Sequence, residues 1–86
     1  MKKIIIEDDK EGLVSLMGER ITLMCAVYFY TGKLVGVSDD CVKLEDPSIV
    51  YETGAFTNSN WTDAQKLPHK YWYVQRAMIE SWGIMK

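Results

Sequence analysis

The stretch YTGKLVGVSDDCVKLEDP, residues 30–47, decides how this sequence folds. Its apolar and polar residues alternate as in a β-strand, yet it places Gly32 and Gly36 where a strand usually carries bulky side chains. Both glycines have the same parity along the chain as Leu34, so both gaps fall on one face of the predicted strand. Glycines on one face let a strand coil sharply without side-chain collisions. We therefore expect a corner in a strongly bent sheet.

Alternating apolar residues continue on both sides of this corner. Between residues 19 and 38 both odd and even positions are largely apolar, which indicates strands that are covered on both faces. A turn near Cys25 divides this run into two strands. The acidic turn SDD ends the second strand, and Pro47 is expected to separate the third strand from the fourth. The predicted strands cover residues 19–25, 27–38, 41–46, 48–56 and 70–80.

A helix is predicted before the first strand and a loop before the last. Leu13, Leu16 and Met17 recur at three- and four-residue spacing ahead of Gly18, which predicts an amphipathic helix over about residues 8–17. Residues 57–69 hold turn formers without periodicity and predict a long loop, a kind that is often functional in compact domains. The predicted fold is mainly β: a helix, then a five-stranded antiparallel small barrel, in a single domain over residues 1–86.

Composition adds an expectation of self-association. The chain has 86 residues, and a domain of that size buries only about 60% of its unfolded surface, so it is marginal as a monomer. Five Tyr, three Trp and two Phe are more aromatic side chains than one small core easily encloses. We expect some of them to line an interface or a ligand.

Several classes of function are not supported by the residues. Two distant cysteines and one histidine lack the spacing of metal ligands, and no nucleophile–base constellation or phosphate-binding loop is present. We therefore expect no metal, no cofactor and no enzymatic activity. The apolar run after the initial MKK is too short for an export signal or a membrane span, so we expect a cytoplasmic protein without a membrane partner. The net charge of −2 means that any nucleic-acid site must be local.

Three segments carry a resemblance to the Sm-like family, which includes LSm and Hfq-type RNA-binding rings. LVSLMGERITL, residues 13–23, resembles that family's passage from helix to first strand, and GKLVGVSDDCVKLEDP, residues 32–47, resembles its first motif. VQRAMI, residues 74–79, is similar in position and character to its second motif. The resemblance implies an SH3-type barrel of the Sm-like kind. SH3-like and OB-like barrels have similar strand lengths and bend glycines, and they stand as alternatives.

The resemblance also implies a partner and a site. Sm-like subunits join edge to edge, fourth strand to fifth, into a ring that catalyses no reaction. Each grips a base between the turn after the bent strand and the turn before the last strand. Two acids at the first turn depart from the family's usual aromatic, histidine or asparagine, and they would repel phosphate. In this sequence the two turns hold Ser38, Asp39, Asp40, Gln75 and Arg76.

Aromatic side chains beside a cation extend the expected site. Arg76 is its best single contact, because a guanidinium stacks on a base and also bonds phosphate. Lys70, Tyr73 and Trp61 offer the cation and rings typical of single-strand stacking. Two functions follow. The first is a ring that binds single-stranded nucleic acid, with RNA expected rather than DNA, and acts in RNA processing or chaperoning. The second is a homo-oligomeric assembly module without a nucleic-acid ligand. The acidic turn and negative net charge favour the second.

Overall fold

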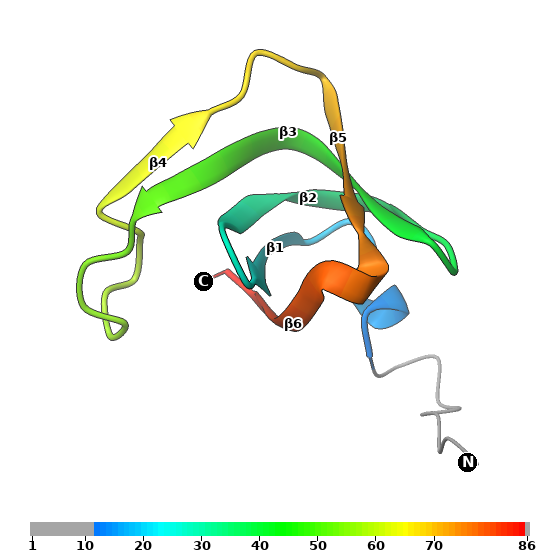
Figure 1. Cartoon of the computed structure of the whole chain (residues 1–86), viewed down its shortest axis with the longest axis horizontal. Coiled ribbons are helices and arrows are strands. Elements are labelled where there is room, and N and C mark those ends of the chain that lie inside the picture. The colour runs from blue at the N-terminus through cyan, green and yellow to red at the C-terminus, as the bar shows by residue number, and fades with distance from the viewer. Residues whose placement is uncertain (1–11, 86) are drawn as a thin grey trace.

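A computed structural model describes residues 12–85 as one antiparallel sheet of six strands, which confirms the predicted mainly β architecture (Figure 1). The helical segments of this part of the chain are two three-residue 3-10 turns, and none of them is long and apolar enough to cross a membrane. The elements are η1 (Val14–Leu16), β1 (Arg20–Cys25), β2 (Phe29–Val37), β3 (Cys41–Glu52), β4 (Asp63–Lys66), β5 (Tyr71–Gln75), η2 (Arg76–Met78) and β6 (Ile79–Ile84).

Strand β3 organises the sheet. The strands lie in the order β4-β3-β2-β1-β6, and β5 pairs with β3 as well. On one edge β3 pairs with β2, and on its other edge it pairs first with β5 and then with β4. Figure 1 shows β3 as a long arch with β5 and β4 along its two halves. The sheet therefore has two halves that share β3.

The corner expected at Gly32 is present as a bulge. In the β2–β3 ladder, the residue before Gly32 pairs with Ser48 and the residue after it pairs with Glu45. Strand β3 therefore has two residues, Asp46 and Pro47, opposite Gly32 alone, which is the pattern of a β-bulge. A Cβ atom at Gly32 would lie 3.1 Å from the Glu45 carbonyl oxygen and 3.4 Å from Pro47 Cα. A close approach of two backbones thus requires glycine here.

The expected strands 41–46 and 48–56 form one strand, β3, and Pro47 does not break it. The prediction fails because Pro47 lies where β3 changes partners. Pairing with β5 ends at Glu45, and pairing with β4 begins at Ser48. A proline cannot donate to a ladder, but at a bulge between two partner strands no donor is needed.

Two further boundaries differ from the sequence prediction. The expected loop 57–69 contains a strand, β4, whose residues DAQK show no apolar alternation because main-chain pairing with β3, rather than burial, holds this edge strand. The expected strand 70–80 is divided by η2 into β5 and β6, so the sheet has six strands rather than five. No glycine or proline marks that division in the sequence.

The helix expected over residues 8–17 is wrong where it can be compared. Residues 12–17 contain only the short turn η1, and Gly12 has a φ of 78°, outside the right-handed helical region. Residues 8–11 lie outside the described residues. The three- and four-residue spacing of the leucines still has a structural use, because Leu13 is buried and Leu16 packs against the core.

The core lies on one face of the sheet. Alternate residues of β1, β2 and β3 point to this face, where Leu34, Val42 and Leu44 are completely buried. Strand β5 contributes Val74 from the other side of β3. The buried cluster consists of Leu13, Ile21, Leu23, Cys25, Leu34, Val42, Leu44 and Val74.

Candidate functional site

Five of the predicted site residues, Ser38, Asp39, Asp40, Gln75 and Arg76, meet at one end of the sheet and are called the turn cluster below. The β3–β5 ladder sets Cys41 opposite Gln75, which brings the turn after β2 beside η2. The backbone N–H of Arg76 donates to the Asp40 carbonyl at 2.8 Å, and Arg76 Nη1 donates to the Ser38 carbonyl at 2.9 Å. Two segments far apart in sequence are thereby fastened together.

The first turn of the cluster is built by Ser38. Its hydroxyl oxygen accepts hydrogen bonds from the backbone N–H groups of Asp40 at 3.3 Å and Cys41 at 3.1 Å. This local bonding leaves Asp39 and Asp40 exposed to solvent. The cluster therefore presents two carboxylates and one guanidinium, and one N–H of that guanidinium already bonds the Ser38 carbonyl.

Lys70 lies at the opposite end of β5 from the turn cluster. The cation nearest the β5 tyrosines is Lys43, whose Nζ lies 4.0 Å from the Tyr71 ring centroid and 5.8 Å from that of Tyr73. Lys70 Nζ lies 5.4 Å from the Tyr71 centroid. Sequence reasoning missed Lys43 because only the register, which pairs Lys43 with Tyr73, brings the two strands' side chains together.

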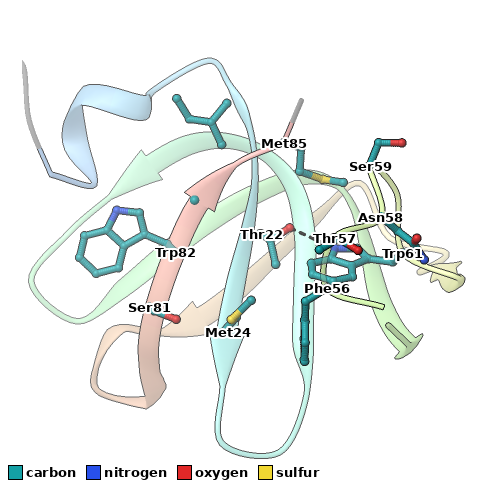
Figure 2. Close-up of a pocket in the computed structure, with 12 residues that line it drawn as sticks. Thr22, Met24, Phe56, Thr57, Asn58, Ser59, Trp61, Ser81, Trp82 and Met85 are labelled. Atoms are coloured by element: carbon teal, nitrogen blue, oxygen red, sulfur yellow. Dashed lines mark hydrogen bonds between the residues drawn. The ribbon is translucent and has the colours of Figure 1, made fainter. Parts of the chain in front are cut away.

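Trp61 belongs to another part of the surface. Its Nε1 donates to the Thr22 hydroxyl at 3.2 Å, and its ring meets Phe29 and Phe56 edge to face at 6.0 and 6.4 Å between centroids. These contacts hold residues 53–62 over the face of β1 and β6, where they form one wall of an open cavity (Figure 2). The structure therefore does not bring Trp61 to the turn cluster.

A second concave surface, the hairpin groove, borders β5. It has a volume of about 430 Å³ and lies between the β1–β2 turn and the strand β5 with η2. Its lining is mainly apolar, and Val27 and Tyr28 of the turn are exposed. The lining residues are Cys25, Ala26, Val27, Tyr28, Tyr30, Trp72, Tyr73, Val74, Gln75 and Met78.

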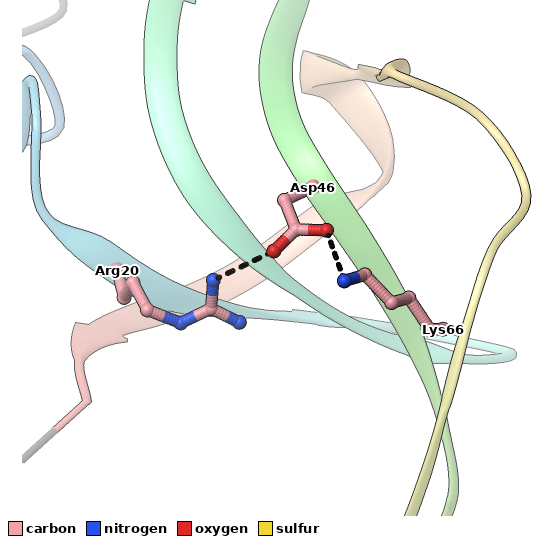
Figure 3. Close-up of polar contacts among 3 residues, drawn as sticks. All are labelled: Arg20, Asp46 and Lys66. Atoms are coloured by element: carbon pink, nitrogen blue, oxygen red, sulfur yellow. Dashed lines mark ion pairs between the residues drawn. The ribbon is translucent and has the colours of Figure 1, made fainter.

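The charged cluster around Asp46 is structural in character. Lys66 Nζ lies 2.9 Å from one carboxylate oxygen of Asp46, and Arg20 Nη1 lies 3.8 Å from the other (Figure 3). The hydrogen bond from Lys66, aided by the charges of Lys66 and Arg20, holds the pKa of Asp46 below its usual range. The three residues come from β1, β3 and β4, so the cluster ties these strands together at the bulge.

The two cysteines differ in environment. Cys25 is buried in the core, where desolvation, with a smaller effect of the Glu80 charge, raises the pKa of its thiol. A thiol kept protonated in this way packs as a small apolar group. Cys41 is half-buried beside the turn cluster, with its Sγ 3.6 Å from the Ser38 hydroxyl oxygen.

No model of a known protein family matches the sequence, and a search of curated proteins found no match either.

Proposed function

We propose that this protein is an Sm-like domain, curled as a small SH3-type barrel, that assembles into a cyclic homo-oligomer through the edges of β5 and β6. One observation carries the proposal. Among the described strands, β5 pairs only with β3 and β6 pairs only with β1, so each has an unpaired edge. Unpaired edges are templates for strands of other chains. The proposal assigns the protein no catalysed reaction.

The choice of edges differs from the sequence expectation. Residues 48–52 pair with β2 on one side and β4 on the other, so this part of the expected fourth strand has no edge to offer. Strand β4 also has an unpaired edge, but the two edges that adjoin η2 are those of β5 and β6, one for each neighbour in a ring. An edge of each kind on every subunit is what a head-to-tail ring requires.

Exposed apolar side chains beside these edges support the proposal. In the hairpin groove Val27 is 76% exposed, Met78 50% and Tyr28 49%. Strand β6 carries Trp82 and Ile84, which are also largely exposed. Apolar surface gathered in this way is typical of protein–protein contact sites. A β6 strand placed against the β5 edge of a neighbour would bring these two sets of side chains near each other.

Light scattering on the wild type and on two matched variants tests assembly. We expect a multiple of the chain mass at micromolar concentration, a monomer mass for Tyr28→Asp, and the wild-type mass for Tyr51→Asp. Both tyrosines are exposed, but only Tyr28 lines the hairpin groove. Burying a carboxylate in an apolar interface is costly, so Tyr28→Asp should prevent association. A monomeric wild type would sink the proposal.

The turn cluster favours a second candidate, in which the ring binds single-stranded nucleic acid, RNA before DNA, in RNA processing or chaperoning. The observation behind it is the contact of Arg76 with the Ser38 carbonyl, which sets Gln75 and Arg76 beside the first turn. A guanidinium has five donor hydrogens, so Arg76 can bond a base or phosphate while keeping its bond to Ser38. The carboxylates of Asp39 and Asp40 repel phosphate, so the affinity for nucleic acid must come from many weak sites repeated around the ring.

Titration with short oligo-U, oligo-A and single-stranded DNA at two salt concentrations tests this candidate. Arg76→Ala should weaken binding severely, and Asp40→Asn should strengthen it by removing a charge that repels phosphate. The salt dependence should be shallow because each subunit neutralises few phosphates. If the wild type binds no oligonucleotide at low salt while its mass stays oligomeric, the assembly module alone is the function.

A further inference from the structure

The cavity under residues 53–62 is separate from the turn cluster and from the hairpin groove. It has a volume of about 540 Å³, a size typical of sites for small molecules. Its floor is the face of β1 and β6, and its wall is the segment that carries Phe56 and Trp61 (Figure 2). The lining residues are Thr22, Met24, Phe56, Thr57, Asn58, Ser59, Trp61, Ser81, Trp82, Gly83, Ile84 and Met85.

Among the described residues the lining has no charged side chain, although charged residues make up 26% of the sequence. Besides the Thr22 hydroxyl, which is bonded to Trp61, its side-chain hydroxyls and amide belong to Thr57, Asn58, Ser59 and Ser81, and these four residues are exposed. A phosphate, carboxylate or ammonium group would find no counter-charge there. The chemistry of the cavity therefore suits a neutral ligand with hydrogen-bonding groups.

The floor is open where β6 carries glycine. Gly83 pairs with Thr22 in the β1–β6 ladder, and a Cβ atom at Gly83 would have no atom within 4 Å. Because side chains alternate along a strand, the neighbouring Trp82 faces the other side, and Figure 2 shows its ring directed away from Trp61. The missing side chain at Gly83 thus leaves space directly beneath a ligand.

The aromatic wall is already fixed in place. The indole N–H of Trp61 is bonded to the Thr22 hydroxyl, and Phe56 meets the Trp61 ring edge to face, 6.4 Å between centroids and 86° between planes. A preorganised ring loses little conformational entropy when a ligand binds. It also means that Trp61 contributes its ring rather than its N–H, and the hydroxyls and amide around it contribute the hydrogen bonds.

We propose that this cavity binds a neutral hydroxylated ring, the hexose unit of a saccharide. The C–H face of such a ring packs against an aromatic side chain, and its hydroxyl groups exchange hydrogen bonds with serine, threonine and asparagine side chains. A neutral aromatic ligand would use the wall but not the hydroxyls, and a charged ligand would use neither. The site serves binding only, and no bond in the saccharide is made or broken.

The indole N–H signals of the full-length protein, read by NMR, report on the site. The sequence has three tryptophans, of which Trp61 and Trp82 line the cavity and Trp72 does not. The Trp61 signal, from the wall, should shift on titration while that of Trp72 stays in place. The probes are glucose, N-acetylglucosamine and a maltose-type trisaccharide, with glucuronate and free indole as comparisons. Saturable shifts with the neutral sugars support the proposal. Larger shifts with the trisaccharide would show that the ligand is a chain of sugar units rather than a free monosaccharide.

The variants Gly83→Ala and Gly83→Val fill the floor in two steps, and the added Cβ atom has open space around it. We expect weaker binding for alanine and complete loss for valine, with the wild-type melting temperature retained. Asn58→Ala provides a second variant, which removes a rim amide and should reduce affinity several-fold if the amide bonds a hydroxyl. The proposal is overturned if neutral sugars leave the Trp61 signal unmoved, if Gly83→Val binds as the wild type does, or if indole or glucuronate binds more tightly.

Discussion

Gly32 and Gly36 look equivalent in the sequence, but the structure gives them different roles. At Gly32 a Cβ atom would lie 3.0 Å from Leu44 Cβ and 3.1 Å from the Glu45 carbonyl oxygen, in the buried bulge. At Gly36 its nearest neighbour would be the Cβ atom of Lys43, at 3.2 Å on a half-exposed surface. Only at Gly32 is the obstacle partly backbone, which cannot move away without shifting a strand.

We therefore expect Gly32→Ala to lower the free energy of unfolding by about 1–3 kcal/mol, the usual cost of overpacking. Gly36→Ala should lower it by less, because its close contact is with one side-chain Cβ atom on a half-exposed surface rather than with backbone in the buried bulge. Urea unfolding of both variants, followed by circular dichroism, measures the difference. Equal midpoints for the two variants would show that the close approach at Gly32 does not control the bend.

Asp46 combines a special backbone with an ion-paired carboxylate. Its φ of 54° lies in the left-handed region, which asparagine and aspartate tolerate better than alanine does. Its carboxylate pairs with Lys66 and Arg20, so its folded pKa is lower than its unfolded pKa. A lowered pKa means that the stabilisation is present above about pH 4, the unfolded pKa range, and disappears as pH falls through the folded pKa.

Asp46→Asn should keep the backbone but lose this acid-dependent stabilisation, so its unfolding midpoint should fall less steeply than that of the wild type below about pH 4. Asp46→Ala should be the less stable of the two variants at neutral pH, because it adds the cost of the left-handed φ. Thermal melts over a pH series compare the three proteins. Parallel curves for wild type and Asp46→Asn would contradict the role of the ion pairs.

Residues 53–62 form a segment that has a glycine at positive φ near its start. Gly54 has a φ of 68°, and a Cβ atom there would collide with the Thr62 hydroxyl. The segment is closed by Thr62, whose backbone N–H donates to the Thr53 carbonyl at 3.3 Å. The hydrogen bond from Trp61 to Thr22 attaches the segment to the sheet.

Gly54→Ala should therefore loosen this segment, at a cost of about 1 kcal/mol or more, because alanine is disfavoured at positive φ. The expected signs are faster hydrogen exchange at the Trp61 indole and easier quenching of its fluorescence. Gly83→Ala is the matched control, since it adds the same methyl group in open space. Unchanged exchange at Trp61 in Gly54→Ala would show that the segment is held by other contacts.

At the scale of the whole molecule, the proposed assembly would contribute to stability by covering exposed apolar side chains and unpaired edges. If the subunits associate when folded and separate when unfolded, the unfolding temperature must rise with protein concentration. We expect this rise for the wild type and for Tyr51→Asp but not for Tyr28→Asp, whose hairpin groove would hold a carboxylate. Calorimetry at several concentrations measures it, and a wild-type midpoint independent of concentration would contradict assembly.

The sequence by itself determined the local features of this protein. Alternation gave the inward positions of Val42 and Leu44, since a strand's side-chain period is visible in the chain. The two glycines indicated a corner on one face of the strand, and the structure places the close backbone approach at Gly32. Within the expected site, the turn residues were predicted to be neighbours, and Arg76 and Ser38 are in contact.

Only the tertiary structure decided which strands pair and what the pairing brings together. Pro47 could remain inside β3 because two different partners meet there, and β4 forms by pairing rather than by any pattern of its own. The strand register places Lys43 beside the tyrosines of β5. The hydrogen bond from Trp61 to Thr22, residues far apart in the sequence, holds Trp61 at the cavity over β1 and β6. These contacts depend on pairing between strands that are distant in the sequence, and the local periodicity of a strand does not specify which strands it pairs with.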